Sequence, residues 1–96
     1  MKKHTLVTRV GNNPKKYSGN VNVPIYQTST LIFDKYADIA AAKQTYGRLG
    51  TDTNKALEEA ICKVEDGYKT IVTSSGLSAI TSVLLSCLAK GDHLLV

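Results

Sequence analysis

The sequence predicts an α/β fold in which an extended arm precedes the incomplete beginning of an α/β domain. The first 30 residues contain both prolines and show little helical periodicity, which is typical of an extended segment. Two stretches downstream, 53–67 and 76–90, carry the apolar spacing of helices, and a short apolar run separates them. Alternation at these lengths is typical of a β-α-β crossover in a parallel sheet. We therefore divide the chain into an arm, 1–34, and a truncated α/β domain, 35–96.

The arm is expected to lie extended against another surface. Val21, Val23 and Ile25 alternate with polar residues, which is the pattern of a strand-like segment with one apolar face. The arm carries too few apolar residues to form a core of its own. We therefore expect it to pack on another part of the protein or on a second chain.

A short helix is expected at residues 36–45. Alanines at positions 40–42 favour helix, and Asp34 is placed as a candidate N-cap. The next eight residues, YGRLGTDT, combine glycine, threonine and aspartate and predict a loop.

A helix with one apolar face follows this loop. Its apolar residues recur at the spacing i, i+3, i+4, i+7 and are Leu57, Ala60, Ile61 and Val64. Thr53 or Asn54 is expected to cap its start, and Gly67 to end it.

A strand, a second helix and the start of a further strand complete the predicted order. Residues 69–73 predict a short buried strand, and the helix after it is expected to run to Lys90. Its broad apolar face consists of Leu77, Ile80, Val83, Leu84, Cys87 and Leu88. Residues 91–96 read as a turn and the opening of an apolar strand, so we expect an interrupted fold.

Composition narrows the function classes. The 96 residues are 43% hydrophobic and 21% charged, which is typical of globular chains. The net charge is +4, but the lysines are scattered and do not alternate with aromatic residues, so nucleic-acid binding is not expected. Cys62 and Cys87 lack metal-ligand spacing, so no metal site is expected. No apolar run approaches the roughly 20 residues of a membrane span, and a cytoplasmic location is expected by default.

The junction TSSGLSA, residues 73–79, is the first candidate site. The first N–H groups of a helix have no partner inside it, and the helix dipole adds positive charge there. A phosphate fits such a position, with Ser75 able to donate a hydrogen bond and Gly76 allowing close approach. Simple helix capping by these residues is the alternative. Neither a Walker lysine nor a dinucleotide fingerprint is present.

The loop YGR is the second candidate site. Arg48 offers a planar guanidinium that can bind phosphate through two hydrogen bonds, and the hydroxyl of Tyr46 can add a third. Taken alone, a solvated arginine and a tyrosine at the edge of a core explain the pair equally well.

The two candidate sites, in this order, carry a family resemblance. The segments that match are VNVPIYQTSTLIFD, YGRLGTDT, EEAICKVEDG, SSGLSAI and LAKGDHLLV. They resemble the trans-sulfuration family, the pyridoxal 5′-phosphate (PLP) enzymes of cysteine and methionine metabolism, and within it the cystathionine β-lyases. The resemblance implies that this chain forms the start of a PLP-transferase type I (aspartate aminotransferase-like) large domain. Asp52 stands where the family often has proline.

The resemblance also implies which residues contact the cofactor. Ser75, Gly76 and Leu77 match the segment that holds the PLP phosphate, and Tyr46 and Arg48 match residues that reach the same phosphate from a neighbouring subunit. An oligomer is therefore implied. Its partner would be a second copy or a separate C-terminal chain, contacted through the arm and the Tyr46/Arg48 loop.

Catalysis is not expected from this chain alone. In the family the lysine that binds PLP covalently, the acidic partner of the ring nitrogen and the stacked aromatic ring all lie downstream of the matched region, so no catalytic residue is assigned. An intact relative would convert cystathionine to homocysteine, pyruvate and ammonia. The open alternatives are a product of a truncated or split gene, a small complementing subunit, a γ-lyase or γ-synthase fragment, and a small basic anion- or nucleic-acid-binding protein.

Overall fold

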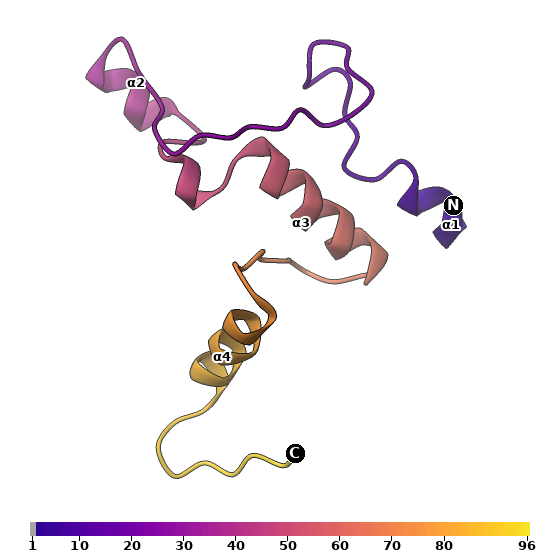
Figure 1. Ribbon diagram of the computed structural model, residues 1–96, viewed down its shortest axis with the longest axis vertical. Helices are drawn as coiled ribbons and strands as arrows, with labels where there is room; N and C mark the ends of the chain where they lie inside the picture. Colours follow the sequence, from indigo (N-terminus) through magenta and orange to yellow (C-terminus); the bar gives the residue numbers. More distant parts are fainter. Residues whose placement is uncertain (1) are drawn as a thin grey trace.

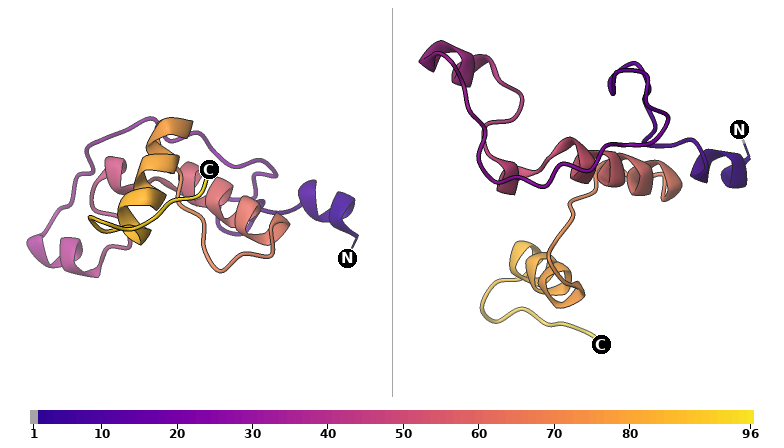
Figure 2. Two further views of the ribbon diagram at one scale, coloured as in Figure 1. Left: turned by 90° about the horizontal axis from the view of Figure 1, so that it is seen from below. Right: turned by 45° about the horizontal axis from the view of Figure 1, so that its top comes forward.

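Four helices and one turn of 3₁₀ helix form the regular structure of residues 2–96, the part of the chain that this computed structural model describes (Figure 1). In chain order they are α1 (Lys3–Val7), α2 (Tyr36–Ala41), the 3₁₀ turn (Gly47–Leu49), α3 (Asp52–Val64) and α4 (Gly76–Cys87). α1 packs beside α3. α4 stands apart from α3 in Figure 1 and in the right view of Figure 2. None of the helices in the described residues is long and apolar enough to cross a membrane.

The helices are spread out and do not pack into one compact domain. The radius of gyration of the Cα atoms is 17.2 Å, whereas a compact domain of this length has about 12–13 Å. The accessible surface is 8409 Å², against about 5,400 Å² for a folded monomer of this mass. Tyr17 and Ala56 are the only apolar side chains of the described residues that are buried, and both line one cavity between the arm and α3. The core is therefore small and lies at that junction.

The arm is attached to α3 by polar contacts. Thr53 Oγ1 accepts a hydrogen bond from the Tyr26 N–H (2.9 Å) and donates one to the Pro24 carbonyl (2.8 Å). Closer to the N-terminus, Lys16 Nζ forms an ion pair of 2.7 Å with Asp52. Between these contacts and α2 the arm passes the 3₁₀ turn, beyond the first turn of α3, without regular strands or helices (Figures 1 and 2). The first turn of α3 is thus the anchor of the arm.

The start of α3 differs from the prediction. Thr51, and not Thr53 or Asn54, is the N-cap, so the helix begins at Asp52 within the predicted loop. The Asn54 side-chain oxygen accepts hydrogen bonds from the Thr51 N–H (3.2 Å) and the Thr51 hydroxyl (2.8 Å). The bond from the Thr51 N–H is the part of a capping box in which the third helical residue bonds back to the cap. Thr53 is left free to bind the arm.

Two other local predictions are corrected. α2 is present, but it ends at Ala41, and Lys35 and not Asp34 is its N-cap, with no side-chain hydrogen bond. α1 was not predicted, because the first residues were expected to be extended. A helix of this length is unstable in isolation, and packing against α3 is what supports it here.

The predicted sheet is not formed within residues 2–96. Neither residues 69–73 nor the C-terminal residues 92–96 pair as strands, and one isolated antiparallel bridge joins Thr30 to Tyr46. A strand needs the donors and acceptors of a neighbouring strand, and no such neighbour lies beside these two segments. The helical half of the α/β prediction is therefore confirmed, and the strands are wrong for this chain as it stands.

α4 begins where it was predicted but ends at Cys87 and not at Lys90, and its apolar face is not buried. Leu77 is 74% exposed, Ile80 59% and Val83 61%. The Ser75 cap and the backbone hydrogen bonds define the helix locally, whereas burial of its apolar face requires a second surface.

Candidate functional site

The predicted phosphate corner lies at the start of α4. Ser75 is the N-cap, and its Oγ accepts a hydrogen bond from the Ser78 N–H at 3.1 Å. Its carbonyl accepts one from the Thr73 hydroxyl at 2.9 Å. Within the described residues, the N–H groups of Gly76 and Leu77 have no hydrogen-bond partner. The positive end of a 12-residue helix therefore presents two unpaired donors.

The corner is open to a ligand. Gly76 is exposed, and a Cβ placed on it would meet nothing within 4 Å. An anion can therefore approach the two free N–H groups without displacing a side chain. The donor set also suits a phosphate, because oriented backbone N–H groups at a helix start bind phosphate oxygens. The residues present thus fit a phosphate ester.

A carboxylate on α3 holds the segment that leads into the corner. Glu58 Oε1 accepts a hydrogen bond from the Val72 N–H at 3.0 Å. This contact bridges 14 residues and ties the start of the α4 segment to the middle of α3. It replaces one of the ladder hydrogen bonds that a neighbouring strand would provide.

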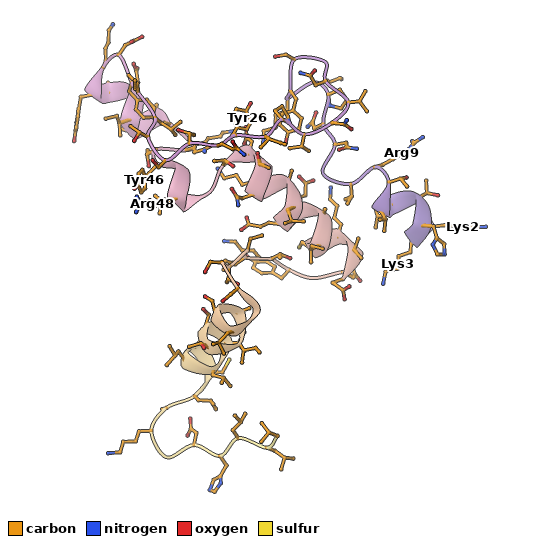
Figure 3. The ribbon with its side chains drawn as sticks, viewed as in Figure 1. Lys2, Lys3, Arg9, Tyr26, Tyr46 and Arg48 are labelled. Atoms are coloured by element: carbon orange, nitrogen blue, oxygen red, sulfur yellow. The ribbon has the colours of Figure 1, made fainter. Side chains whose placement is uncertain are left out.

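Tyr46 and Arg48 lie beside each other near the start of α3, where the arm passes on its way to α2 (Figure 3). The guanidinium carbon of Arg48 is 5.5 Å from the centroid of the Tyr46 ring, which is the distance of a cation–π contact. Both side chains are exposed. In the described residues Arg48 forms no ion pair, so its donors are available to an anion.

The backbone of this loop is bound to the arm. The Gly47 N–H donates to the Ser29 carbonyl at 2.8 Å, next to the bridge between Thr30 and Tyr46. The 3₁₀ turn closes the loop through a hydrogen bond of 3.0 Å from the Leu49 N–H to the Tyr46 carbonyl. The orientation of Tyr46 and Arg48 is thus determined by the arm on one side and by a turn on the other.

The structure does not bring the two predicted elements together in one chain. An open cavity of about 360 Å³ reaches from Arg48 to Ile71 and Val72, a few residues before the corner, but Ser75 and Gly76 do not line it. Within this chain the two candidate sites are therefore neighbouring but separate.

Lys16 and Asp52 were not predicted as functional residues. The hydrogen bond to Asp52 is the main cause that raises the pKa of Lys16, against a smaller opposing effect of burial. The ion pair neutralises the carboxylate that stands where the family often has proline. No sequence signal connects the two residues, because they are 36 positions apart.

Comparison with known proteins agrees with the resemblance seen in the motifs. The sequence profile of the Cys/Met metabolism PLP-dependent enzymes matches residues 4–96. The cystathionine beta-lyase of Bacillus subtilis is 41% identical over all of this chain, and that of Bordetella avium is 36% identical over 96% of it. The L-methionine gamma-lyase of Fusobacterium nucleatum is 41% identical over 82% of it.

These relatives are much longer than this chain. The match covers 25% of the Bacillus protein, 26% of the Bordetella protein and 22% of the Fusobacterium protein. The chain thus spans about a quarter of the length of the curated relatives it matches, and the match extends over nearly all of its own residues. The chain therefore belongs to the Cys/Met metabolism PLP-dependent enzyme family, whose cofactor is pyridoxal phosphate.

Proposed function

We propose that this chain supplies the phosphate-binding part of a PLP-dependent carbon–sulfur lyase of the cystathionine β-lyase type, and that it is inactive alone. The observation that carries the proposal is the open start of α4, where the N–H groups of Gly76 and Leu77 are unpaired. When bound, PLP supplies an electron sink for the carbanion that forms on an amino-acid substrate. The residues of this chain bind and orient the cofactor.

At the corner, three groups are suited to the phosphate. The two N–H groups would donate to phosphate oxygens, with the α4 dipole favouring the negative charge. The Ser75 oxygen already accepts from Ser78, but its own hydroxyl hydrogen remains available to donate. Binding through backbone N–H groups orients the phosphate without a flexible side chain, so the ring of the cofactor would be held in one direction.

Tyr46 and Arg48 would complete the site from a second chain. Their exposure, their stacking and the lack of an ion pair at Arg48 among residues 2–96 support this part of the proposal, as does their separation from the corner within one chain. The guanidinium would bind two phosphate oxygens, and the phenol hydroxyl would donate to the third. The second chain is another copy or a separate chain that carries the remaining three quarters of the family fold.

Methionine γ-lyase activity is the second candidate for the assembled protein. It is favoured by the 41% identity to the L-methionine gamma-lyase of Fusobacterium nucleatum, which equals the identity to the Bacillus cystathionine beta-lyase. A basic surface that binds nucleic acid has less support, because the basic residues do not form one continuous patch. Lys2, Lys3 and Arg9 lie around α1, at the opposite end of α3 from Arg48 (Figure 3).

Titration of the isotope-labelled chain tests the proposal. On addition of PLP or inorganic phosphate, the amide resonances of Gly76 and Leu77 are expected to shift, with an affinity on the order of millimolar because only a few hydrogen bonds form. Pyridoxal, which lacks the phosphate, serves as the control and is expected to leave these resonances in place. Unchanged amides, or equal shifts with pyridoxal, would contradict the phosphate site.

A further inference from the structure

Gly47 sits between the two candidate phosphate ligands and differs from both in its surroundings. Gly47 is buried, whereas Tyr46 and Arg48 on either side of it are exposed. A Cβ placed on Gly47 would overlap the Thr28 carbonyl oxygen, and it would lie 2.8 Å from the Thr28 carbonyl carbon and 3.0 Å from Ser29 Cα. All these atoms are backbone, so no side chain can rotate away to make room.

Space, and not backbone conformation, is what requires glycine at this position. The glycines with positive φ are Gly11, Gly19, Gly50 and Gly91, so Gly47 adopts a φ that any residue can adopt. The close approach is held by the hydrogen bond of 2.8 Å from the Gly47 N–H to the Ser29 carbonyl. Any side chain would push the loop away from the arm by about 1 Å, which is enough to break a hydrogen bond of this length.

We propose that Gly47 is a positioning residue, whose lack of a side chain lets arm residues 28–30 seat the loop and thereby orient Tyr46 and Arg48 as a pair. The proposal rests on the proposed function, because it takes the pair as phosphate ligands. The arm contacts the loop from the Gly47 side, and the two ligand side chains remain in solvent on either side of it. The arm is thus part of the phosphate site through its backbone.

Gly47→Ala in the full 96-residue chain tests the proposal, with Gly67→Ala as the matched control. A Cβ on Gly67 would meet only the Cys62 carbonyl at 3.7 Å, which is an ordinary contact. We expect the amide of residue 47 to lose at least tenfold of its hydrogen-exchange protection in Gly47→Ala, and the ring-current shift that Tyr46 causes on Arg48 to disappear. The control variant is expected to keep both. Retention of both in Gly47→Ala would overturn the proposal.

The ligand response distinguishes this proposal from the proposed function. The PLP concentration needed to shift the Arg48 side-chain N–H is expected to rise at least tenfold in Gly47→Ala, while the Gly76 and Leu77 amides respond as before. If the Gly76 and Leu77 amides of the unsubstituted chain did not respond to PLP, the proposed function would fail. The orienting effect of Gly47 would then be judged by exchange protection and ring-current shift alone.

A second pair of variants acts from the arm and covers the case in which Gly47→Ala does not fold. The Thr28 hydroxyl donates to the Thr30 carbonyl at 2.9 Å and shapes the arm segment that meets the loop. Thr28→Val removes this hydrogen bond and is expected to lower protection of the Gly47 amide severalfold, whereas Thr28→Ser keeps the hydroxyl and restores it. Equal protection in the Val and Ser variants would count against control of the loop by the arm.

Discussion

Thr53→Val should loosen the attachment of the arm to α3 at Tyr26. The substitution keeps the size and β-branching of the side chain, so the helix itself is little changed. It removes the hydrogen bond that Thr53 Oγ1 accepts from Tyr26 and the one that it donates to Pro24. A hydrogen bond of this kind contributes about 0.5–1.5 kcal/mol net, and water can partly replace these two because they are not fully buried, so the expected loss is about 1–2 kcal/mol.

The effect should be local and can be read at one amide. The Tyr26 N–H donates to Thr53, so its hydrogen-exchange protection reports opening of the arm. A loss of 1–2 kcal/mol corresponds to a fall in protection of roughly 5- to 30-fold at 25 °C. Helical amides in the middle of α3, such as that of Ala60, should keep their protection, because Thr53 lies in the first turn.

Thr53→Ser is the matched control, because it keeps the hydroxyl and removes only a methyl group. It should retain most of the protection at Tyr26. The reasoning would be refuted if the valine variant exchanged like the unsubstituted chain, or if the serine variant lost as much protection as the valine variant. Either result would mean that the arm is held by something other than this hydroxyl.

Four further predictions concern charge, helix capping, phosphate binding and catalysis. Asp52→Asn should return the pKa of Lys16 toward 10.5 in a resonance titration, because the ion pair raises that pKa in the folded chain. The small stabilisation that the ion pair gives the folded chain is complete below pH 10.5 and is lost at higher pH. Ser75→Ala should cost about 1 kcal/mol or less of α4 stability, read by circular dichroism, because the cap is lost. Ser75→Asp should keep the helix but weaken the phosphate response of Gly76 and Leu77, since a carboxylate caps well and repels an anion. The chain mixed with PLP and cystathionine should release pyruvate no faster than PLP alone, and faster release would show that the chain is catalytic by itself.

The features that the sequence predicted correctly are those with local causes. The two apolar spacings placed α3 and α4 within a few residues, because a helix bonds each N–H to a carbonyl four residues earlier and needs no distant partner. The predicted helix at α2 was correct for the same reason. The candidate ligands Tyr46, Arg48, Ser75, Gly76 and Leu77 remain predictions that the titrations above will test.

The errors arose where an element depends on distant residues. Residues 69–73 have the composition of a strand, but a strand forms only when a second one supplies its hydrogen bonds. Thr53 is a reasonable cap by type, yet Thr51 takes that position and Thr53 binds the arm, 27 residues before it at Tyr26. α1 has no strong helical signal of its own and depends on α3.

By itself, the sequence determined the family, its cofactor and the presence of helices α2, α3 and α4, since motifs and helical periodicity depend on residues close together in the chain. Only the tertiary structure decided which face of the loop meets the arm, why Gly47 tolerates no side chain, and how Lys16 offsets the charge of Asp52. These contacts join residues that lie 16 to 36 positions apart, and their geometry depends on how the backbone path brings the segments together. Residue types and their spacing along the chain do not specify that path.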